Sequence, residues 1–422
     1  MQRIGLGLAV ALCCLAAGAT SAHAQATVTL ESAIERVLQE SPRVKAASSA
    51  REAADATRKQ AGLWYNPEIG LMTENVGGSG IYKGTDAAET TLGVTQRIEL
   101  GGKRSSRIDA ANETSAIGRI DELRSRATLI HDTKVAYANA VAAQEMLTLA
   151  GEQKALAKEL SGEVGERVNA AREPIIQARK AEITTATAEV AHMRATREAG
   201  HARHVLSSLW GGHEETYAID PSDFYALTPP PSEATVEAGL DEGLDLKRMR
   251  TAERLGKANF ELEKANAVPD PSVNASVRRL SISDDQAFVV GVSFPLPVLN
   301  RNQGNIARAR AQLSQAQSET SAAELSLRND VFEALETMAN AYEHAAKFDQ
   351  SILPSAEKAF ALARDGYRRG RFPYLEVLDA QRTLFAVKEQ RIATLNEYHK
   401  AKAELERMTT PATQPEEKND AE

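Results

Sequence analysis

The feature that most constrains this chain of 422 residues is an internal repeat. Motifs of the first half return about 200 residues later: Thr29-Leu30-Glu31 as Thr235-Val236-Glu237, Asn66-Pro67 as Asp270-Pro271, Leu92-Gly93-Val94-Thr95 as Val290-Gly291-Val292-Ser293, His131-Asp132 as Asn329-Asp330, and Pro174 as Pro373. A near-constant offset over so long a stretch indicates duplication of one structural unit. We therefore expect two similar repeats, residues 25–210 and 235–408, joined by a linker at 211–234.

The first 24 residues have the pattern of an export signal. Arg3 precedes an apolar stretch, and Ala22-His23-Ala24 forms an A-x-A cleavage site. Both cysteines, Cys13 and Cys14, lie in this segment, so we expect no disulfide and no thiolate metal site in the mature protein. Acylation of Cys13 would require a small residue before it, and Leu12 stands there; we expect no lipid anchor.

The charge balance argues against one class of partner. The chain has 58 acidic and 50 basic residues and a formal net charge of −8, which leaves no basic surplus for nucleic acid. Beyond the signal segment, no stretch approaches the 18 or more uninterrupted apolar residues of a transmembrane helix. Any membrane passage must therefore use strands.

Each repeat contains two long segments with helical periodicity, at about 103–167 and 174–209 in the first and about 302–364 and 373–408 in the second. The longer helix of each pair would reach about 95 Å, which is wider than a compact domain. Abundant alanines permit close helix approach, as in an extended antiparallel coiled bundle. An ordinary helical bundle is the alternative.

Between the helices lie four segments that alternate with a period of two, at about 67–75, 89–99, 271–279 and 286–297. Each has about ten residues, enough to cross a bilayer as a tilted strand, and Trp64, Tyr65 and Tyr82 lie near strand ends, where interfacial aromatics are favoured. Four strands cannot close a barrel, and an open edge cannot face lipid. A spanning protein must therefore oligomerise; the alternative is a small soluble sheet packed on the bundle.

The order of these segments resembles the TolC family of outer-membrane efflux channels, and the resemblance covers essentially the whole mature chain. A strand pair followed by a long helical hairpin, present twice, is the plan of that family. Two motifs, Asn66-Pro67-Glu68 and the run ETTLGVTQRIELGGKR at 89–104, are similar to the outer-membrane subunits of cobalt, zinc and cadmium efflux systems.

The resemblance implies a mainly α fold with a small membrane β part. In that fold a homotrimer forms a twelve-stranded β-barrel in the outer membrane, which continues into a periplasmic α-helical barrel. It further implies a periplasmic adaptor protein, an inner-membrane pump of the resistance-nodulation-division (RND) type and outer-membrane lipid as partners. No cofactor and no catalytic site are implied.

The closed end of such a channel lies at the turns between long helices, here at 168–176 and 367–375. The resemblance makes Tyr367 a residue that ties neighbouring helices together, and makes Glu376 and Asp379 acidic positions at the entrance. The other candidates at this end are Arg368, Arg371 and Gln177 for the gate and Ala171, Pro174, Gly370 and Pro373 for the adaptor-docking turns. Ala171 departs from the family pattern, in which glycine is common at that position.

The spacing of the entrance acids agrees with such a role. Glu376 and Asp379 are three residues apart and share a helix face, so three copies would place six carboxylates around an opening that attracts cations. Without the resemblance, solvated surface acids would be the simpler interpretation. Arg368, Arg369 and Arg371 either pair with acids across protomers or cap helix ends.

Other motifs give weaker evidence about function. His201 and His204 share a helix face with His213 just beyond and are weak metal candidates; ordinary surface histidines are the better interpretation. Gly101-Gly102-Lys103-Arg104 does not complete a phosphate loop, because Arg97 and Arg104 replace a required glycine and a required Ser or Thr. No nucleophile motif is apparent, and residues 409–422 are predicted to be a disordered acidic tail.

These observations predict a passive exit duct in the outer membrane for divalent heavy-metal cations, driven by a separate pump. A drug-efflux or protein-secretion duct is the alternative within the fold. A periplasmic coiled-coil structural protein is the alternative from another class, and an enzyme is the least favoured.

Overall fold

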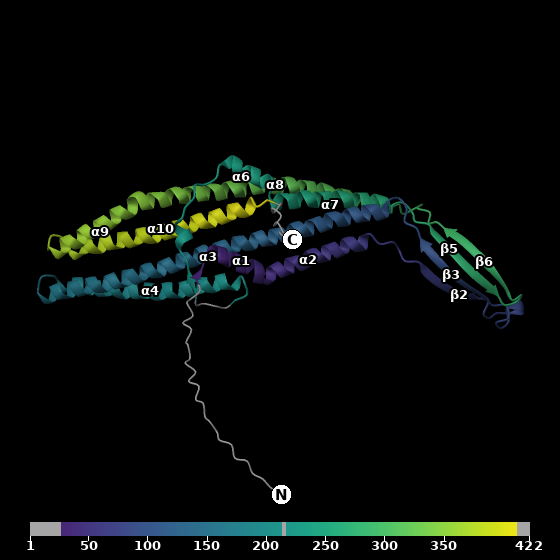
Figure 1. The fold of residues 1–422 in the computed structure, drawn as a ribbon, viewed down its shortest axis with the longest axis horizontal. Helices are drawn as coiled ribbons and strands as arrows, with labels where there is room; N and C mark the ends of the chain where they lie inside the picture. Colours follow the sequence, from purple (N-terminus) through teal and green to yellow (C-terminus); the bar gives the residue numbers. More distant parts are fainter. Residues whose placement is uncertain (1–26, 213–216, 412–422) are drawn as a thin grey trace, which may run out of the picture.

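The computed structural model describes residues 27–212 and 217–411. The expected signal segment, His213 and most of the acidic tail lie outside the described residues. The described part is an elongated molecule, with strands at one end and the turns of two helical hairpins at the other (Figure 1). This is the mainly α fold with a small β part that the sequence predicts.

The helices are α1 (Leu30–Glu40), α2 (Pro42–Ala61), α3 (Lys103–Asn169), α4 (Ile175–Ser208), α5 (Ser222–Tyr225), α6 (Glu233–Asp241), α7 (Leu244–Asn266), α8 (Gln303–Lys347), α9 (Leu353–Arg368) and α10 (Tyr374–Met408). The strands are β1 (Thr27–Val28), β2 (Glu68–Glu74), β3 (Glu89–Arg97), β4 (Ala218–Ile219), β5 (Ser272–Leu280) and β6 (Asp285–Ser293). Two short turns of other helix types, η1 (Gly80–Tyr82) and η2 (Phe348–Ile352), complete the set.

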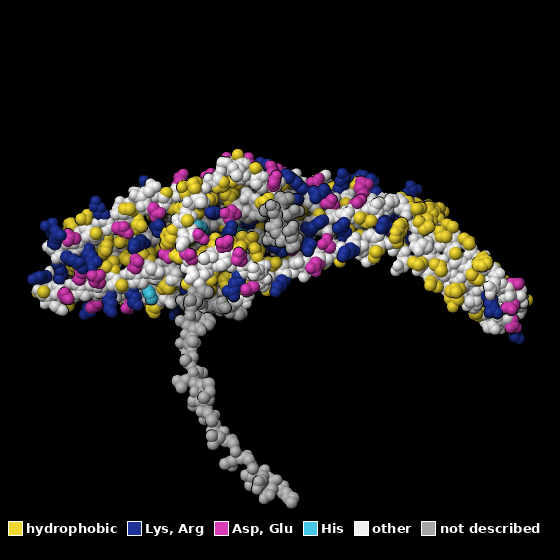
Figure 2. Space-filling model, viewed as in Figure 1, with side chains coloured by type: hydrophobic (Ala, Val, Ile, Leu, Met, Phe, Trp, Pro, Cys, Tyr) yellow, Lys and Arg dark blue, Asp and Glu magenta, His cyan; other side chains and the backbone are white. Residues whose placement is uncertain are grey.

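Strands β2, β3, β5 and β6 form one antiparallel sheet in that order, so the two repeats meet where β3 pairs with β5. The register aligns apolar residues across all four strands. One row is Leu71, Leu92, Val277 and Phe288, and the next is Ile69, Val94, Ala275 and Val290. Most of this face is exposed, up to 89% at Phe288, and Figure 2 shows hydrophobic side chains covering the strands.

The opposite face of the sheet is polar or small. Gly93 lies beside Ser276, where an added Cβ would be only 2.6 Å from the serine Cβ. Asn274 Nδ2 donates to Thr95 Oγ1 at 3.0 Å, and Arg278 pairs with Glu89 at 3.0 Å. The period-two alternation therefore separates an apolar face from a hydrogen-bonded polar face.

Away from the sheet, the helices pack side by side in the order α4, α3, α10 and then α8 with α9; toward the sheet, the order is α2, α3, α7 and α8 (Figure 1). Two buried tyrosines hold the linker between the repeats against these helices. Tyr137 on α3 donates to the Asp220 carbonyl at 2.7 Å, and Tyr398 on α10 donates to the Thr228 carbonyl at 2.7 Å. The linker thus crosses the middle of the helical shaft at a defined place.

The long helix of the second repeat differs from expectation, because it is not continuous. A π-helical turn, η2, separates α8 from α9. Pro354 lies just after it, and a proline lacks the amide hydrogen and clashes with the carbonyl four residues earlier. The extra residue of a π turn accommodates that defect. Helix α3 contains no proline and runs unbroken for 67 residues.

The turns at the far end of the two hairpins share one backbone geometry. Gly370 has φ +73° and Ala171 has φ +55°, so both adopt the left-handed conformation after a helix. That conformation costs an L-residue about 1–2 kcal/mol, but costs glycine nothing. Ala171 is therefore strained at the position where the resemblance to the TolC family leads us to expect glycine.

We predict that Ala171→Gly stabilises its turn by up to about 1 kcal/mol. The substitution removes the strain of the left-handed conformation, and the greater conformational entropy that glycine gives the unfolded chain offsets only part of this gain. Gly370→Ala is the matched control and should destabilise its turn by about 1 kcal/mol. Hydrogen exchange of peptides covering 165–176 and 364–375 measures both. Faster exchange in the Ala171→Gly turn would contradict the strain.

Candidate functional site

The tip of the shaft, at the two hairpin turns, gathers most of the predicted site residues. Pro174 and Pro373 are the residues that precede α4 and α10, and Ala171 and Gly370 form the left-handed turns before them. All four are exposed. Gln177 is half-buried in the first turn of α4, and its side-chain oxygen is buried without a hydrogen bond in the described structure.

Tyr367 is fully buried within its own chain. Its ring lies 5.9 Å from that of Tyr374, measured between centroids, and the Arg167 guanidinium lies 4.3 Å above it. Burial, followed by the nearby Glu173 carboxylate, raises the pKa of the Tyr367 hydroxyl. Tyr367 thus joins α9, α10 and α3 of one protomer.

Arg368 pairs with acids of the same chain, which neither sequence-based alternative described. Its Nη2 atom lies 2.5 Å from Glu163 and 3.5 Å from Glu159, both on α3. Arg364, one turn earlier, pairs with the same two carboxylates. We call Glu159, Glu163, Arg364 and Arg368 the α3–α9 clasp. Burial raises the pKa of Glu163, but its bonds to Arg368 and Arg364 outweigh burial and hold the pKa below its ordinary value.

Glu159, Glu163 and Arg364 were not predicted from the sequence, although a signal was available. The acids are four residues apart on one helix and the arginines four apart on another, which is the spacing that aligns two ion pairs along a helix contact. Arg369 pairs with Asp365 of its own helix at 3.0 Å. Arg371 makes no ion pair within the described ranges.

Glu376 and Asp379 lie in the first two turns of α10, and both are exposed. Neither carboxylate has an ion-pair partner among the residues that the structure describes. They are therefore available to solvent or to another molecule at the tip.

Among the residues that the structure describes, the histidines do not assemble into a metal centre. His201 is exposed and His204 half-buried on α4. Within residues 27–212 and 217–411, the structure has no group of three or more His, Cys, Asp and Glu side chains that could hold a metal ion.

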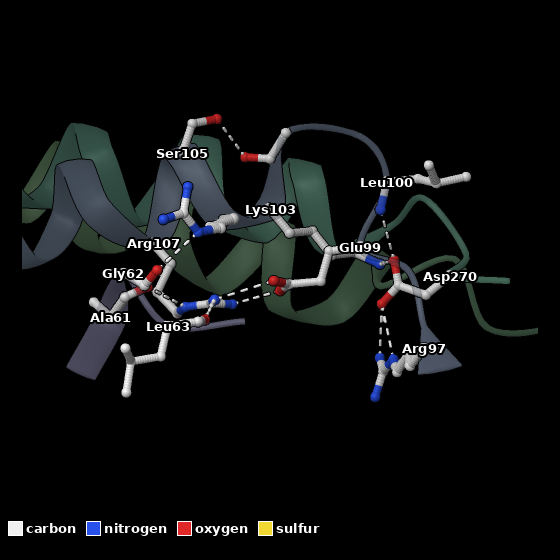
Figure 3. Close-up of polar contacts among 12 residues, drawn as sticks. Ala61, Gly62, Leu63, Arg97, Glu99, Leu100, Lys103, Ser105, Arg107 and Asp270 are labelled. Atoms are coloured by element: carbon white, nitrogen blue, oxygen red, sulfur yellow. Dashed lines mark hydrogen bonds and ion pairs between the residues drawn. The ribbon is translucent and has the colours of Figure 1, made fainter. Parts of the chain in front are cut away.

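A second polar site, which sequence reasoning noted only as a motif, lies where the strands become helices (Figure 3). Asp270, 6% exposed, accepts from Arg97 at 2.8 Å, from the Leu100 amide at 3.0 Å and from Lys103 at 2.5 Å. Asp270 precedes β5, whereas its partners run from the end of β3 (Arg97) through Leu100 to the start of α3 (Lys103). This carboxylate therefore ties the two repeats together at the end of the sheet.

Glu99 forms the other half of this junction. Its side chain is 2% exposed and binds Arg107 through both oxygens, at 2.5 and 3.1 Å. Arg107 also donates to the carbonyls of Ala61 and Leu63 (Figure 3). The run 97–107 is therefore a structural joint, and its glycines serve close packing: a Cβ on Gly101 would lie 2.5 Å from Val268.

An open sheet with one exposed apolar face, prolonged by long helices, defines a membrane-channel subunit with a helical extension. Among the described residues, no helix is both long and apolar enough to cross a bilayer.

Comparison with known proteins points to the same class of protein. Over 386 residues, the chain is 28% identical to the cobalt-zinc-cadmium resistance protein CzcC of Cupriavidus metallidurans, covering 92% of this chain and 91% of that protein. It is also 28% identical to the nickel and cobalt resistance protein CnrC of the same species, over 70% of each chain.

Two solved structures share the fold. CusC superposes with a TM-score of 0.77 at 18% identity, over 91% of this chain and 92% of that one. The outer membrane protein VceC of Vibrio cholerae superposes with a TM-score of 0.75 at 18% identity, over 90% and 96%.

The family model described as outer membrane efflux protein matches the chain twice, at 33–212 and 236–410. The chain therefore belongs to the outer membrane efflux protein family. Its place is the outer membrane, with the helices extending into the periplasm, and its activity is passage rather than catalysis. Membership excludes the periplasmic coiled-coil scaffold and the enzyme.

We predict that Asp270→Asn destabilises the protein by about 3–5 kcal/mol, because it leaves the buried Lys103 ammonium without a counter-charge. Asp284→Asn is the matched control: its ion pair with Arg279 is largely exposed, so the effect should stay within about 1 kcal/mol. Unfolding of the protein in detergent, followed by circular dichroism, compares them. Equal destabilisation would contradict the special role of Asp270.

Proposed function

We propose that this chain is the outer-membrane exit duct of a tripartite RND efflux system that exports divalent heavy-metal cations such as cobalt, zinc or cadmium. The observation that carries this proposal is the similarity to a cobalt-zinc-cadmium resistance protein over nine-tenths of both chains. The free carboxylates of Glu376 and Asp379 at the tip supply fitting chemistry, since exposed acids attract divalent cations.

The working unit in this proposal is a homotrimer. Strands β2 and β6 are the two edges of the sheet, and an edge cannot face lipid unpaired, because each bare amide or carbonyl would cost several kcal/mol. Pairing β2 of one copy with β6 of the next closes twelve strands into a barrel with the apolar face toward lipid.

The helical edges support the same arrangement. On α4, at one edge of the helical layer, the apolar residues Ile176, Ile183 and Val190 recur every seven residues and are 55–66% exposed. At the other edge, α8 exposes Leu325 and Phe332, also seven residues apart. Stripes of this spacing pack against another helix, and a neighbouring copy would cover both.

In the assembled pump, energy comes from the inner-membrane RND transporter, and this chain needs no cofactor. The periplasmic adaptor docks at the exposed turns that contain Ala171, Pro174, Gly370 and Pro373. Tyr367, Arg368, Arg371 and Gln177 belong to the gate, and Glu376 and Asp379 line its entrance. The α3–α9 clasp holds α9 against α3 and thereby keeps this tip closed.

We predict that Arg364→Gln/Arg368→Gln opens the channel. Losing the clasp removes about 1 kcal/mol from the closed state, which corresponds to about a fivefold rise in the ratio of open to closed channels. Arg369→Gln is the control, because the ion pair that Arg369 makes within the described ranges is with Asp365, four residues earlier, and does not join α9 to α3. Conductance of the purified protein in planar bilayers measures the ratio. If the double variant leaves the ratio of open to closed channels unchanged, the clasp is not part of the gate.

The cargo is tested in a strain that lacks the protein. Deletion should sensitise cells to cobalt, zinc or cadmium, and Glu376→Ala/Asp379→Ala should restore resistance less completely than the wild type. Asp365→Ala, which removes an exposed acid on α9, is the control for loss of a surface carboxylate elsewhere at the tip. Sensitivity to drugs with unchanged metal tolerance would instead favour the drug-efflux duct, and loss of a secreted protein would favour the secretion duct.

A further inference from the structure

The run from the last residue of β3 into the first turns of α3, residues 97–107, carries four cations, and their charges are compensated differently. Arg97 and Lys103 bind Asp270, and Arg107 binds Glu99. Arg104 has no carboxylate partner in the part of the chain that the structure describes. Its Nε atom donates to the neutral Gly62 carbonyl at 2.8 Å. One half-buried guanidinium at this joint is therefore left with an uncompensated charge.

The other contact of Arg104 is aromatic. Its guanidinium lies 5.0 Å from the centroid of the Trp64 ring, which is 64% exposed. A ring face holds a guanidinium in place without neutralising it and leaves N–H donors in the plane of the group. Trp64 thus fixes the position of the Arg104 guanidinium, and the N–H donors of the guanidinium stay available to a ligand, whereas a carboxylate partner would occupy them.

This pair lies at the boundary of the apolar face. The neighbouring Tyr65 carbonyl accepts from Gln96, whose side chain shares a sheet face with Leu92 and Val94. The helices extend into the periplasm, so this boundary meets the periplasmic leaflet. Trp64 stands where aromatic side chains border a bilayer, at the depth of lipid headgroups.

We propose that Arg104 and Trp64 form a binding site for the phosphodiester headgroup of an anionic phospholipid in the periplasmic leaflet. A guanidinium matches two phosphate oxygens through paired N–H donors. A lipid with a net negative charge also compensates the cation that the protein leaves unpaired. The site anchors the joint between strands and helices to the membrane.

Tryptophan fluorescence tests this directly, because the chain has two tryptophans and the other, Trp210, is buried. In a Trp210→Phe background, Trp64 is the only reporter. The full-length protein is reconstituted in mixed phosphatidylglycerol and phosphatidylcholine vesicles of fixed composition, with brominated chains on one lipid or the other at equal mole fraction. The two samples differ only in which lipid carries the bromine label, so the difference in quenching reports which lipid lies beside Trp64.

We expect about fivefold enrichment of phosphatidylglycerol at Trp64, the factor that corresponds to about 1 kcal/mol per surface cation. Arg104→Gln should abolish the enrichment. Arg194→Gln, which removes an exposed cation on α4 far from the strands, should leave it intact. Arg104→Lys should retain part of it, since charge remains but paired donation is lost.

Equal quenching by the two labelled lipids would overturn the proposal even if no Arg104 variant folds, because that comparison uses only the Trp210→Phe protein. Enrichment that survives Arg104→Gln would overturn the role of Arg104. Enrichment abolished by inorganic phosphate would assign the site to the free anion and overturn the lipid assignment. Channel conductance of the same samples shows separately whether the exit duct has assembled.

Discussion

The structure depends on how its strands are joined to its helices. The side chains of a lipid-facing sheet and of a helical shaft repeat with different periods, so one continuous element cannot form both. The four connections between strands and helices must therefore be held at the same height along the molecule. The buried carboxylates of Asp270 and Glu99 do this by gathering Arg97, Lys103 and Arg107. Because Asp270 comes from one repeat and its cations from the other, the ion pairs also hold the duplicated halves in register.

Much of the fold was predictable because its constraints are local. The alternation of Val273, Ala275 and Val277 specifies a two-faced strand, and helical periodicity specifies the long helices, so element type and the repeat pattern follow from spacing alone. The interruption before Pro354 was also visible in principle. It was missed, although a proline inside a helical pattern indicates a kink, because helical periodicity continues on both sides of the π turn.

The site was less predictable, because it depends on pairings between helices distant in sequence. Resemblance indicated Arg368 but not Glu163, its partner 205 residues earlier. Likewise the run 97–107 was visible as a motif, but nothing in it shows that three of its cations are neutralised and that Arg104 is not. Such distinctions arise only when the chain is folded, since they require knowing which carboxylates reach which cations.

The π turn makes the duplicated halves mechanically unequal. One hairpin has an unbroken long member, α3, and the other has a long member that the π turn interrupts, α8 with α9. In a ring of three copies, unbroken and interrupted hairpins would alternate, so the tube would have threefold rather than sixfold symmetry. Any protein that surrounds the tip would then meet two kinds of seam, one inside each subunit and one between subunits, and six identical copies of it could not all be held equivalently.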